Sequence, residues 1–322
     1  KALYLTGYAS YNILKNLTFR TTVGYDNAQI RTDLFYSKIT GTARNFASLP
    51  VASIGQQSNY QISNSNTLQY TLTNFKNHHD ITVLAGQEVV DFNSKQNSIQ
   101  TRYFPADISP EKALANMQLG TVPTGSTATQ PPPTSFEAPA ARIASFFGRV
   151  SYAYDDKYLA NFNLRSDRSS KFSSEKGTLI FPSGSVAWRF SKEKFFDNVK
   201  WLIDGKLRIG YGAVGNNRIG DLLYQQLYGV TGEYAFNHSI VPGFAPSSLS
   251  NPNLKWEKNT TQNYGIDLGM FNNRVQLSVD VYKNTAKDLL LAVAIPSTTG
   301  YSSQLQNIGA TSNRGVELQL NT

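Results

Sequence analysis

The feature that most constrains the fold is a stretch of regularly alternating residues from Asn263 to Lys283, NYGIDLGMFNNRVQLSVDVYK. Apolar and polar residues alternate along two runs, one before and one after the short segment Phe271-Asn272-Asn273. Because successive side chains of a β-strand point to opposite faces, each run predicts a strand with one apolar and one polar face. Asn tolerates the positive φ of a tight turn, so the stretch predicts a β-hairpin.

The same alternation recurs along the whole chain. It predicts strands at residues 2–12, 17–25, 66–74, 81–92, 144–154, 158–167, 182–190, 206–213, 263–269, 275–282 and 315–321. Most have about the eight to eleven residues that a tilted strand needs to cross the hydrocarbon of a membrane. Short turns alternate with longer loops, of which 26–65, 93–142 and 214–261 are the longest. Short periplasmic turns and long extracellular loops are typical of outer-membrane barrels, so the sequence predicts an all-β, antiparallel transmembrane β-barrel.

The composition agrees with a surface that faces lipid. Charged residues make up 16% of the chain and aromatic residues 12%, and aromatic side chains favour the membrane–water boundary. No apolar run is long enough for a transmembrane helix. The chain has no cysteine, which excludes a disulfide scaffold and a thiolate metal site, and we expect no cofactor. The net charge of +8 is spread singly along the chain, so we expect no nucleic-acid partner.

The polar faces of these strands carry charged residues that would point into the lumen of a barrel. They are Arg149, Arg165, Asp167, Arg189, Arg208, Asp267, Asp280 and Glu317. Such side chains could contact a substrate or bond to a plug inside the barrel, and we favour the plug. The strands number about eleven, whereas bacterial barrels have even numbers of strands. Lys1 also opens within an apparent strand, so we expect residues 1–322 to be part of a larger barrel domain.

Aromatic residues in the loops are candidates for contact with a ligand. A flat apolar face with a polar tip can stack on a sugar ring or a peptide side chain. The same residues could instead fold the loops against one another or against a capping partner. The candidates are Tyr103, Phe104, Tyr224, Tyr228, Tyr234, Phe236 and Phe244. A second aromatic set near the short turns predicts an interfacial girdle: Tyr154, Tyr158, Trp188, Phe190, Tyr264 and Phe271.

No motif predicts bond chemistry. Gly210, Gly212 and Gly215 have the spacing of a phosphate-binding loop, but they lie in a predicted strand that no helix follows. His78 and His79 are adjacent, and neighbouring side chains of a strand or turn point apart, so we expect a solvated turn. No Ser/His/Asp set has a spacing that supports a catalytic triad. We therefore do not expect an enzyme.

Several phrases resemble the SusC/RagA-like TonB-dependent outer-membrane transporters. The first two similar segments are LRIGYGAVGNN at Leu207–Asn217 and NPNLKWE at Asn251–Glu257, together with the hairpin that follows it. A third is KDLL at Lys287–Leu290, with the short segments GY, NIG and NRGVEL after it. YLANFNLRSDRSSKF at Tyr158–Phe172 is also similar, with Arg168 where the family usually has Gly. The matches cover about half of the chain, mainly from Phe147 onward.

The resemblance implies a 22-stranded barrel in the outer membrane of a Gram-negative bacterium, closed by an N-terminal plug. It also implies energy from the TonB complex through an N-terminal segment, a SusD-like surface lipoprotein, and an oligosaccharide or peptide substrate. The plug, the TonB-binding segment and the final strands are not recognisable in this sequence. Two alternatives stay open at this point: a soluble or secreted β-sandwich that binds glycans as an adhesin, and a passive outer-membrane pore.

Overall fold

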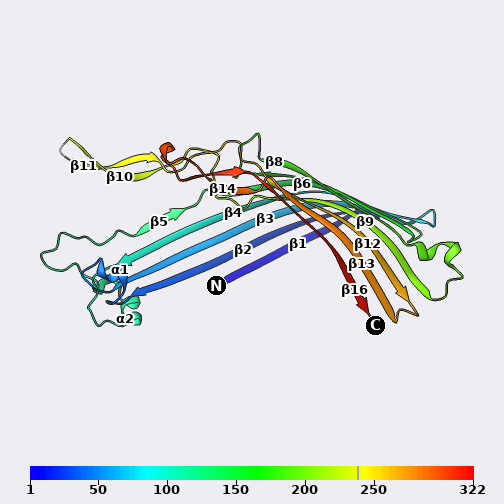
Figure 1. Ribbon diagram of the computed structural model, residues 1–322, viewed down its shortest axis with the longest axis horizontal. Coiled ribbons are helices and arrows are strands. Elements are labelled where there is room, and N and C mark those ends of the chain that lie inside the picture. Colours follow the sequence, from blue (N-terminus) through cyan, green and yellow to red (C-terminus); the bar gives the residue numbers. More distant parts are fainter. Residues whose placement is uncertain (238) are drawn as a thin grey trace. The chain divides into compact units, whose positions relative to one another are not determined.

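The computed structural model describes residues 1–237 and 239–322, and most of them form one antiparallel sheet of twelve strands. Eleven strands lie side by side in chain order (Figure 1). They are β1 (Ala2–Leu14), β2 (Leu17–Tyr36), β3 (Val51–Phe75), β4 (His79–Thr101), β6 (Ala141–Tyr154), β7 (Tyr158–Ser169), β8 (Thr178–Trp188), β9 (Leu202–Asn216), β12 (Glu257–Met270), β13 (Val275–Lys287) and β16 (Ala310–Asn321). The short strand β5 (Thr134–Glu137) pairs with β4 off this path. The predicted all-β antiparallel fold is confirmed.

The longer connections contain smaller elements. Two two-stranded sheets pair β10 (Tyr228–Phe236) with β11 (Ser239–Pro246), and β14 (Leu290–Ala294) with β15 (Ser303–Asn307). The helices are α1 (Gly41–Arg44), α2 (Pro110–Ala115) and the 3-10 turns η1 (Met117–Leu119), η2 (Phe190–Lys192), η3 (Lys194–Phe196) and η4 (Ser297–Thr299). Among the described residues, none of the helices has the length and apolar content to span a membrane.

The chain forms two compact units. Unit 1 comprises residues 1–7, 23–63 and 91–140, and unit 2 comprises residues 8–22, 64–90 and 141–322. In unit 1, Ala52, Phe104 and Ala113 form a small buried core, against which Phe35 and Met117 pack. Both of its α-helices have a side-chain cap at the N-terminus, from Thr40 for α1 and Ser109 for α2.

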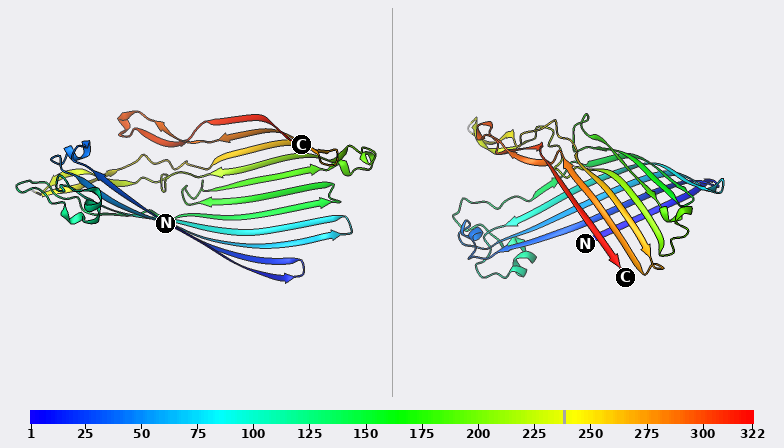
Figure 2. Two further views of the ribbon diagram at one scale, coloured as in Figure 1. Left: turned by 90° about the horizontal axis from the view of Figure 1, so that it is seen from below. Right: turned by 45° about the vertical axis from the view of Figure 1, so that its right-hand side comes forward.

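The hairpin predicted from residues 263–283 is confirmed in detail. Ile266 pairs with Val279 and Leu268 with Leu277, so the two apolar runs share one face. Asn272 and Asn273 both have φ of 60°, as a tight turn requires. In unit 2, the shortest turns lie at one end of the strands and the longest connections at the other, as predicted (Figure 2, left). The exception is the connection 189–201 between β8 and β9, which lies at the end with the short turns.

The strands are longer than the alternation predicts. β2, β3 and β4 have 20, 25 and 23 residues, and they continue through segments 26–65 and 93–142 that we predicted as loops. Apolar alternation is needed only where one face meets lipid, whereas backbone pairing can continue through polar residues once the neighbouring strand is in register. The predicted loop at 214–261 and the connection between β13 and β16 likewise contain paired hairpins.

Within unit 2 the sheet has one polar and one apolar face. The register of each strand against its neighbour shows which side chains share a face. Seven of the predicted charged residues lie on the polar face: Arg149, Arg165, Asp167, Arg208, Asp267, Asp280 and Glu317. On the apolar face, Leu164, Val186 and Ile209 are 44%, 53% and 52% exposed. The buried apolar cluster of this unit lies at its loop end, and no second large sheet is present among the described residues. The β-sandwich alternative is therefore wrong.

Candidate functional site

The loop end of unit 2 has its own buried core. Phe172, Phe181, Leu254 and Trp256 are each at most 6% exposed. The centroid of the Trp256 ring lies 5.6 Å from that of Phe172 and 5.7 Å from that of Phe181, and its indole N–H donates to the carbonyl of Gly177 at 2.8 Å. The core therefore fastens segment 251–257 to the connection between β7 and β8.

A glycine in β9 makes this packing possible. A Cβ added at Gly215 would collide with the rings of Phe181 and Trp256. Two residues further on, Asn217 donates from Nδ2 to Oγ of the buried Ser169 at 3.0 Å. The loop after β9 is thus held against the β7–β8 connection by ring packing and by a side-chain hydrogen bond.

Amide side chains attach the β14–β15 hairpin to the same core. Asn251 donates from Nδ2 to the carbonyl of Leu305 at 2.8 Å. Asn307 accepts from the backbone N–H of Lys255 at 2.9 Å and donates back to its carbonyl at 2.8 Å. We call residues 170–177, 251–257 and 288–309 the loop cluster. Its contacts join three segments that are far apart in the sequence into one packed platform.

A charge network crosses three strands on the polar face. Arg208 of β9 forms two hydrogen bonds of 2.8 Å with Asp267 of β12, and a third of 3.1 Å with Asp280 of β13. Lys206 adds an ion pair of 3.1 Å to Asp267, and Ser278 donates to Asp267 at 2.8 Å. These half-buried charges pair across the three strands and so stabilise their register, although Oδ1 of Asp280 is buried without a hydrogen-bond partner in the described part of the chain.

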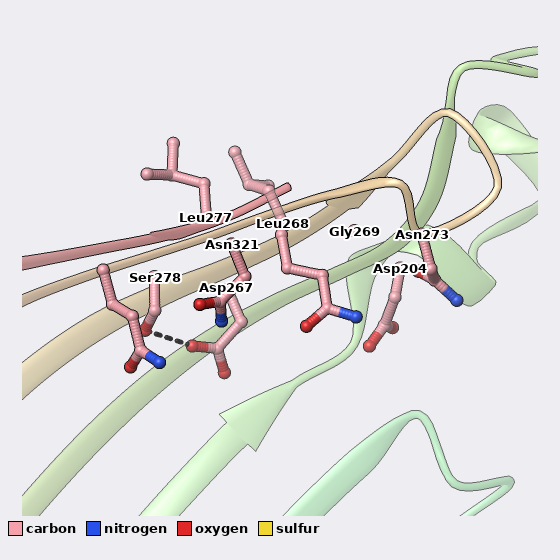
Figure 3. A pocket seen from close by; sticks show the side chains of 10 residues that line it. Asp204, Asp267, Leu268, Gly269, Asn273, Leu277, Ser278 and Asn321 are labelled. Carbon is pink, nitrogen blue, oxygen red and sulfur yellow. Dashed lines mark hydrogen bonds between the residues drawn. The ribbon is translucent and has the colours of Figure 1, made fainter.

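An open pocket of about 440 Å³ lies beside this network, toward the short turns (Figure 3). Asp267 and Ser278 lie on one side of the strands, while Leu268 and Leu277 lie on the opposite side. Asp204 and four amide side chains also line the pocket. The lining is therefore mainly polar and carries two carboxylates, which suits contact with polar or cationic groups.

A second network is centred on Arg165 of β7. Its guanidinium donates to Glu88 and to Asp167 at 2.7 Å each, and to the buried Ser145 at 2.9 Å. The guanidinium carbon also lies 5.4 Å from the ring centroid of Phe147. Arg165 and Asp167 were predicted to face the same side, and the structure brings them into direct contact.

The other predicted polar-face residues lie apart from these networks. Arg149 and Glu317 are exposed, and Glu317 is in register with Asp280. Arg189 lies one residue beyond the end of β8, where its Nε is 3.3 Å from Asp204. Arg189 is thus part of the short-turn end and not of a strand.

The predicted ligand-contact aromatics fall into two groups. Phe104 is fully buried in the core of unit 1, and Tyr103 is 9% exposed with its ring edge-on to Phe46, so neither offers a free face to a ligand. In contrast, the β10–β11 hairpin exposes its aromatic side chains to solvent: Tyr228, Tyr234, Phe236 and Phe244 are between 54% and 72% exposed. Tyr224 is half-buried, and its hydroxyl accepts from Gln225.

The short-turn aromatics meet a carboxylate. Glu193 accepts hydrogen bonds from the Tyr158 hydroxyl at 2.6 Å, from Lys157 Nζ at 3.1 Å and from Trp188 Nε1 at 3.2 Å. An interfacial girdle consists of aromatic rings whose polar tips lie at the level of the membrane–water boundary, and these hydrogen bonds hold the polar tips of Tyr158 and Trp188 together. Tyr264 does not belong to this set, because β12 continues to Met270 and places Tyr264 in mid-strand.

We expect the stability of the segment around Glu193 to depend on pH. The hydrogen bond from Tyr158, followed by that from Lys157, lowers the pKa of Glu193 below its ordinary value of 4.5. Because the pKa is lowered in the folded state, the stabilisation is complete above the ordinary pKa and is lost as the pH falls through the lowered one. Hydrogen exchange at 190–196, corrected for intrinsic rates, should accelerate below pH 4.5. Glu193→Gln should remove this dependence, and an unchanged pH profile in that variant would contradict the assignment.

The two adjacent histidines bond separate partners. The Nδ1 atom of His78 lies 2.6 Å from Asp155, and that of His79 lies 2.9 Å from the Tyr152 hydroxyl. His78 is exposed, in keeping with a solvated turn. Within residues 1–237 and 239–322, no group of three or more His, Asp or Glu side chains is arranged to hold a metal ion.

Comparison with known proteins decides the family. A family model described as TonB dependent receptor-like, beta-barrel matches residues 2–322. The chain belongs to the TonB-dependent receptors. This family consists of outer-membrane receptors and transporters and is not a class of enzymes. The predicted barrel fold and the outer-membrane location are thereby confirmed.

Curated TonB-dependent receptors are similar over most of the chain. TonB-dependent receptor P3 of Formosa agariphila is 31% identical over 98% of this chain and 30% of its own length. TonB-dependent receptor SusC of Bacteroides thetaiotaomicron is 40% identical over 56% of this chain and 18% of its own length. The chain thus spans less than a third of the length of these relatives.

A solved structure has a similar arrangement of strands. The structure titled RagAB peptide importer in the closed-closed state aligns with a TM-score of 0.82 at 29% identity, over 99% of this chain and 33% of that one. Most of the motifs that carried the resemblance lie in the strands β7, β9, β12, β13 and β16, and a smaller part builds the loop cluster. Trp256, Leu254, Asn251 and Asn307 come from them, and all four are structural in this chain. Sequence reasoning missed this packing, although an isolated Trp in an Asn-rich loop was a possible signal for it.

Proposed function

We propose that the chain forms part of the wall of an active importer, which takes up oligosaccharides or oligopeptides across the outer membrane. The observation that carries the proposal is the two-faced sheet with a packed loop cluster at one end, in a chain similar over 99% of its length to a structure titled as a peptide importer. The apolar face would contact lipid and the polar face would line the passage. The protein would act by binding and translocation, without bond chemistry of its own.

Arg165 and Arg208 fit a supporting role in the wall. Their guanidinium groups already bond three carboxylates or hydroxyls each, so they have little capacity left for a passing substrate. We infer that these networks hold the strand register and present a polar surface to the plug. In this proposal the plug, the TonB-binding segment and the remaining strands of a 22-stranded barrel belong to the same full-length polypeptide.

The exposed aromatics of the β10–β11 hairpin are the proposed contact residues at the loop end. Tyr228, Tyr234 and Phe236 could stack on cargo or pack against a SusD-like lipoprotein that caps the mouth. Tyr224 is only half-buried and is kept as a candidate. Tyr103 and Phe104 are left out, because their rings pack inside unit 1.

An uptake assay separates active import from a passive pore. Cells carrying the full-length gene should accumulate fluorescent oligosaccharides or oligopeptides in the periplasm, and deletion of the TonB gene should reduce the accumulation to background. A strain lacking the receptor gene gives that background. Accumulation that persists without TonB would favour the passive pore, and accumulation equal to background in every strain would overturn import.

A further inference from the structure

A polar pocket of about 520 Å³ lies on the loop cluster of unit 2. Two lysines, Lys176 and Lys255, line it from different segments. All its other lining residues are amides, namely Asn251, Asn253, Gln304, Gln306 and Asn307. Amides present donors and acceptors together, and lysines present only donors. The lining therefore suits a ligand that combines hydroxyl groups with an anionic group.

The amide side of the pocket is held in place by hydrogen bonds to the backbone. Gln304 donates from Nε2 to the carbonyl of Ser250 at 2.8 Å, and Gln306 donates to Oε1 of Gln304 at 2.9 Å. Asn307 holds Lys255 through two backbone bonds. The buried core supports this side, since Leu254 and Leu305 pack within it. A ligand would meet walls that are already ordered, which favours affinity.

The pocket also carries uncompensated positive charge. Lys255 forms an ion pair of 3.1 Å with Asp288. Lys176 is exposed and has no ion pair with any residue that the structure describes. Its backbone is fixed in a turn, where the N–H groups of Lys176 and Gly177 donate to the carbonyl of Ser173 at 3.1 and 2.8 Å. The ammonium of Lys176 is therefore free to bind an oxyanion.

We propose that this pocket binds the carboxylate or sulfate group of an acidic oligosaccharide, which is the cargo of the proposed importer. The Lys176 ammonium bonds the anionic group, and Lys255 adds positive charge beside it. Asn253 and Gln306 bond the neighbouring hydroxyls. None of the described lining residues is aromatic, so a neutral sugar has no ring to stack on. A peptide is disfavoured, since none of the lining residues that the structure describes offers a pocket for an apolar side chain.

Calorimetry on the purified full-length protein tests this site. Trigalacturonate or a sulfated trisaccharide should bind at least about tenfold more tightly than maltotriose, and the preference should shrink at high salt. Lys176→Gln should weaken binding of the acidic probe about tenfold, as expected when one charge-assisted bond is lost. Lys200→Gln is the matched control, because Lys200 is also exposed but lies outside the pocket.

Each arm can overturn the proposal. Equal affinity for maltotriose and for both acidic probes removes the anionic preference. Tight binding of triglutamate removes the assignment to an oligosaccharide. An unchanged affinity in Lys176→Gln removes the pocket. The inference rests on the proposed import function, yet the two can fail separately. Uptake that depends on TonB but is the same in Lys176→Gln as in the wild type would support import and rule out only this site.

Discussion

Replacing Trp256 by alanine is expected to destabilise the loop cluster by about 3–5 kcal/mol, the range for truncating a buried tryptophan. The ring is only 5% exposed and packs against both Phe172 and Phe181. The substitution removes these contacts and leaves the carbonyl of Gly177 without its indole donor. The strands of the sheet keep their own pairing, so the loss should be confined to the loop end.

Hydrogen exchange of the full-length protein in detergent measures this loss. Segments 170–177 and 288–309 should lose protection in Trp256→Ala, while β12 and β13 should exchange as in the wild type. Trp201→Ala is the matched control, since Trp201 is 50% exposed and lies in the connection before β9. Trp256→Phe keeps a ring but not the N–H donor and should cost about 1 kcal/mol. Equal protection in Trp256→Ala and the wild type would show that the core does not hold the loops.

The existence of the strands, and the face of the sheet on which each of their side chains lies, were predictable because both depend on local sequence. A period of two fixes which side chains share a face, and Asn272 with Asn273 fixes the turn that sets the register of β12 and β13. The full lengths of β2, β3 and β4 were not predictable. The outer part of β4 is almost entirely polar, and in β2 and β3 polar residues interrupt the apolar ones, so the pairing with a neighbouring strand distinguishes these parts from loops.

The partners within the polar face were also beyond sequence reasoning. Arg208 is 72 residues from Asp280, and Arg165 is 77 residues from Glu88. The alternation of side chains along each strand places such residues on one face. Only the register between neighbouring strands decides which of them come into contact. Burial of loop aromatics is equally tertiary: Phe104 and Phe236 are the same residue type, yet one is fully buried and the other is 66% exposed.

Gly265→Ala is expected to destabilise the polar-face network by about 2 kcal/mol, close to the value of one charge-assisted hydrogen bond. Gly265 of β12 is in register with Arg208 on one side and Asp280 on the other. Arg208 reaches Asp280 by crossing over this glycine. A Cβ there would lie 2.6 Å from Oδ1 of Asp280 and 2.7 Å from Nη2 of Arg208, so the two side chains would have to separate.

Gly210→Ala provides the control on the same face. Gly210 of β9 is in register with Asn263, and a Cβ at this position would meet no heavy atom within 4 Å. Alanine there should leave stability unchanged or raise it by up to about 1 kcal/mol, because glycine weakens a strand interior. Thermal unfolding of the two full-length variants compares them. Equal midpoints would mean that the bond between Arg208 and Asp280 contributes nothing, whereas a lower midpoint for Gly265→Ala alone would assign the loss to the space that Arg208 occupies.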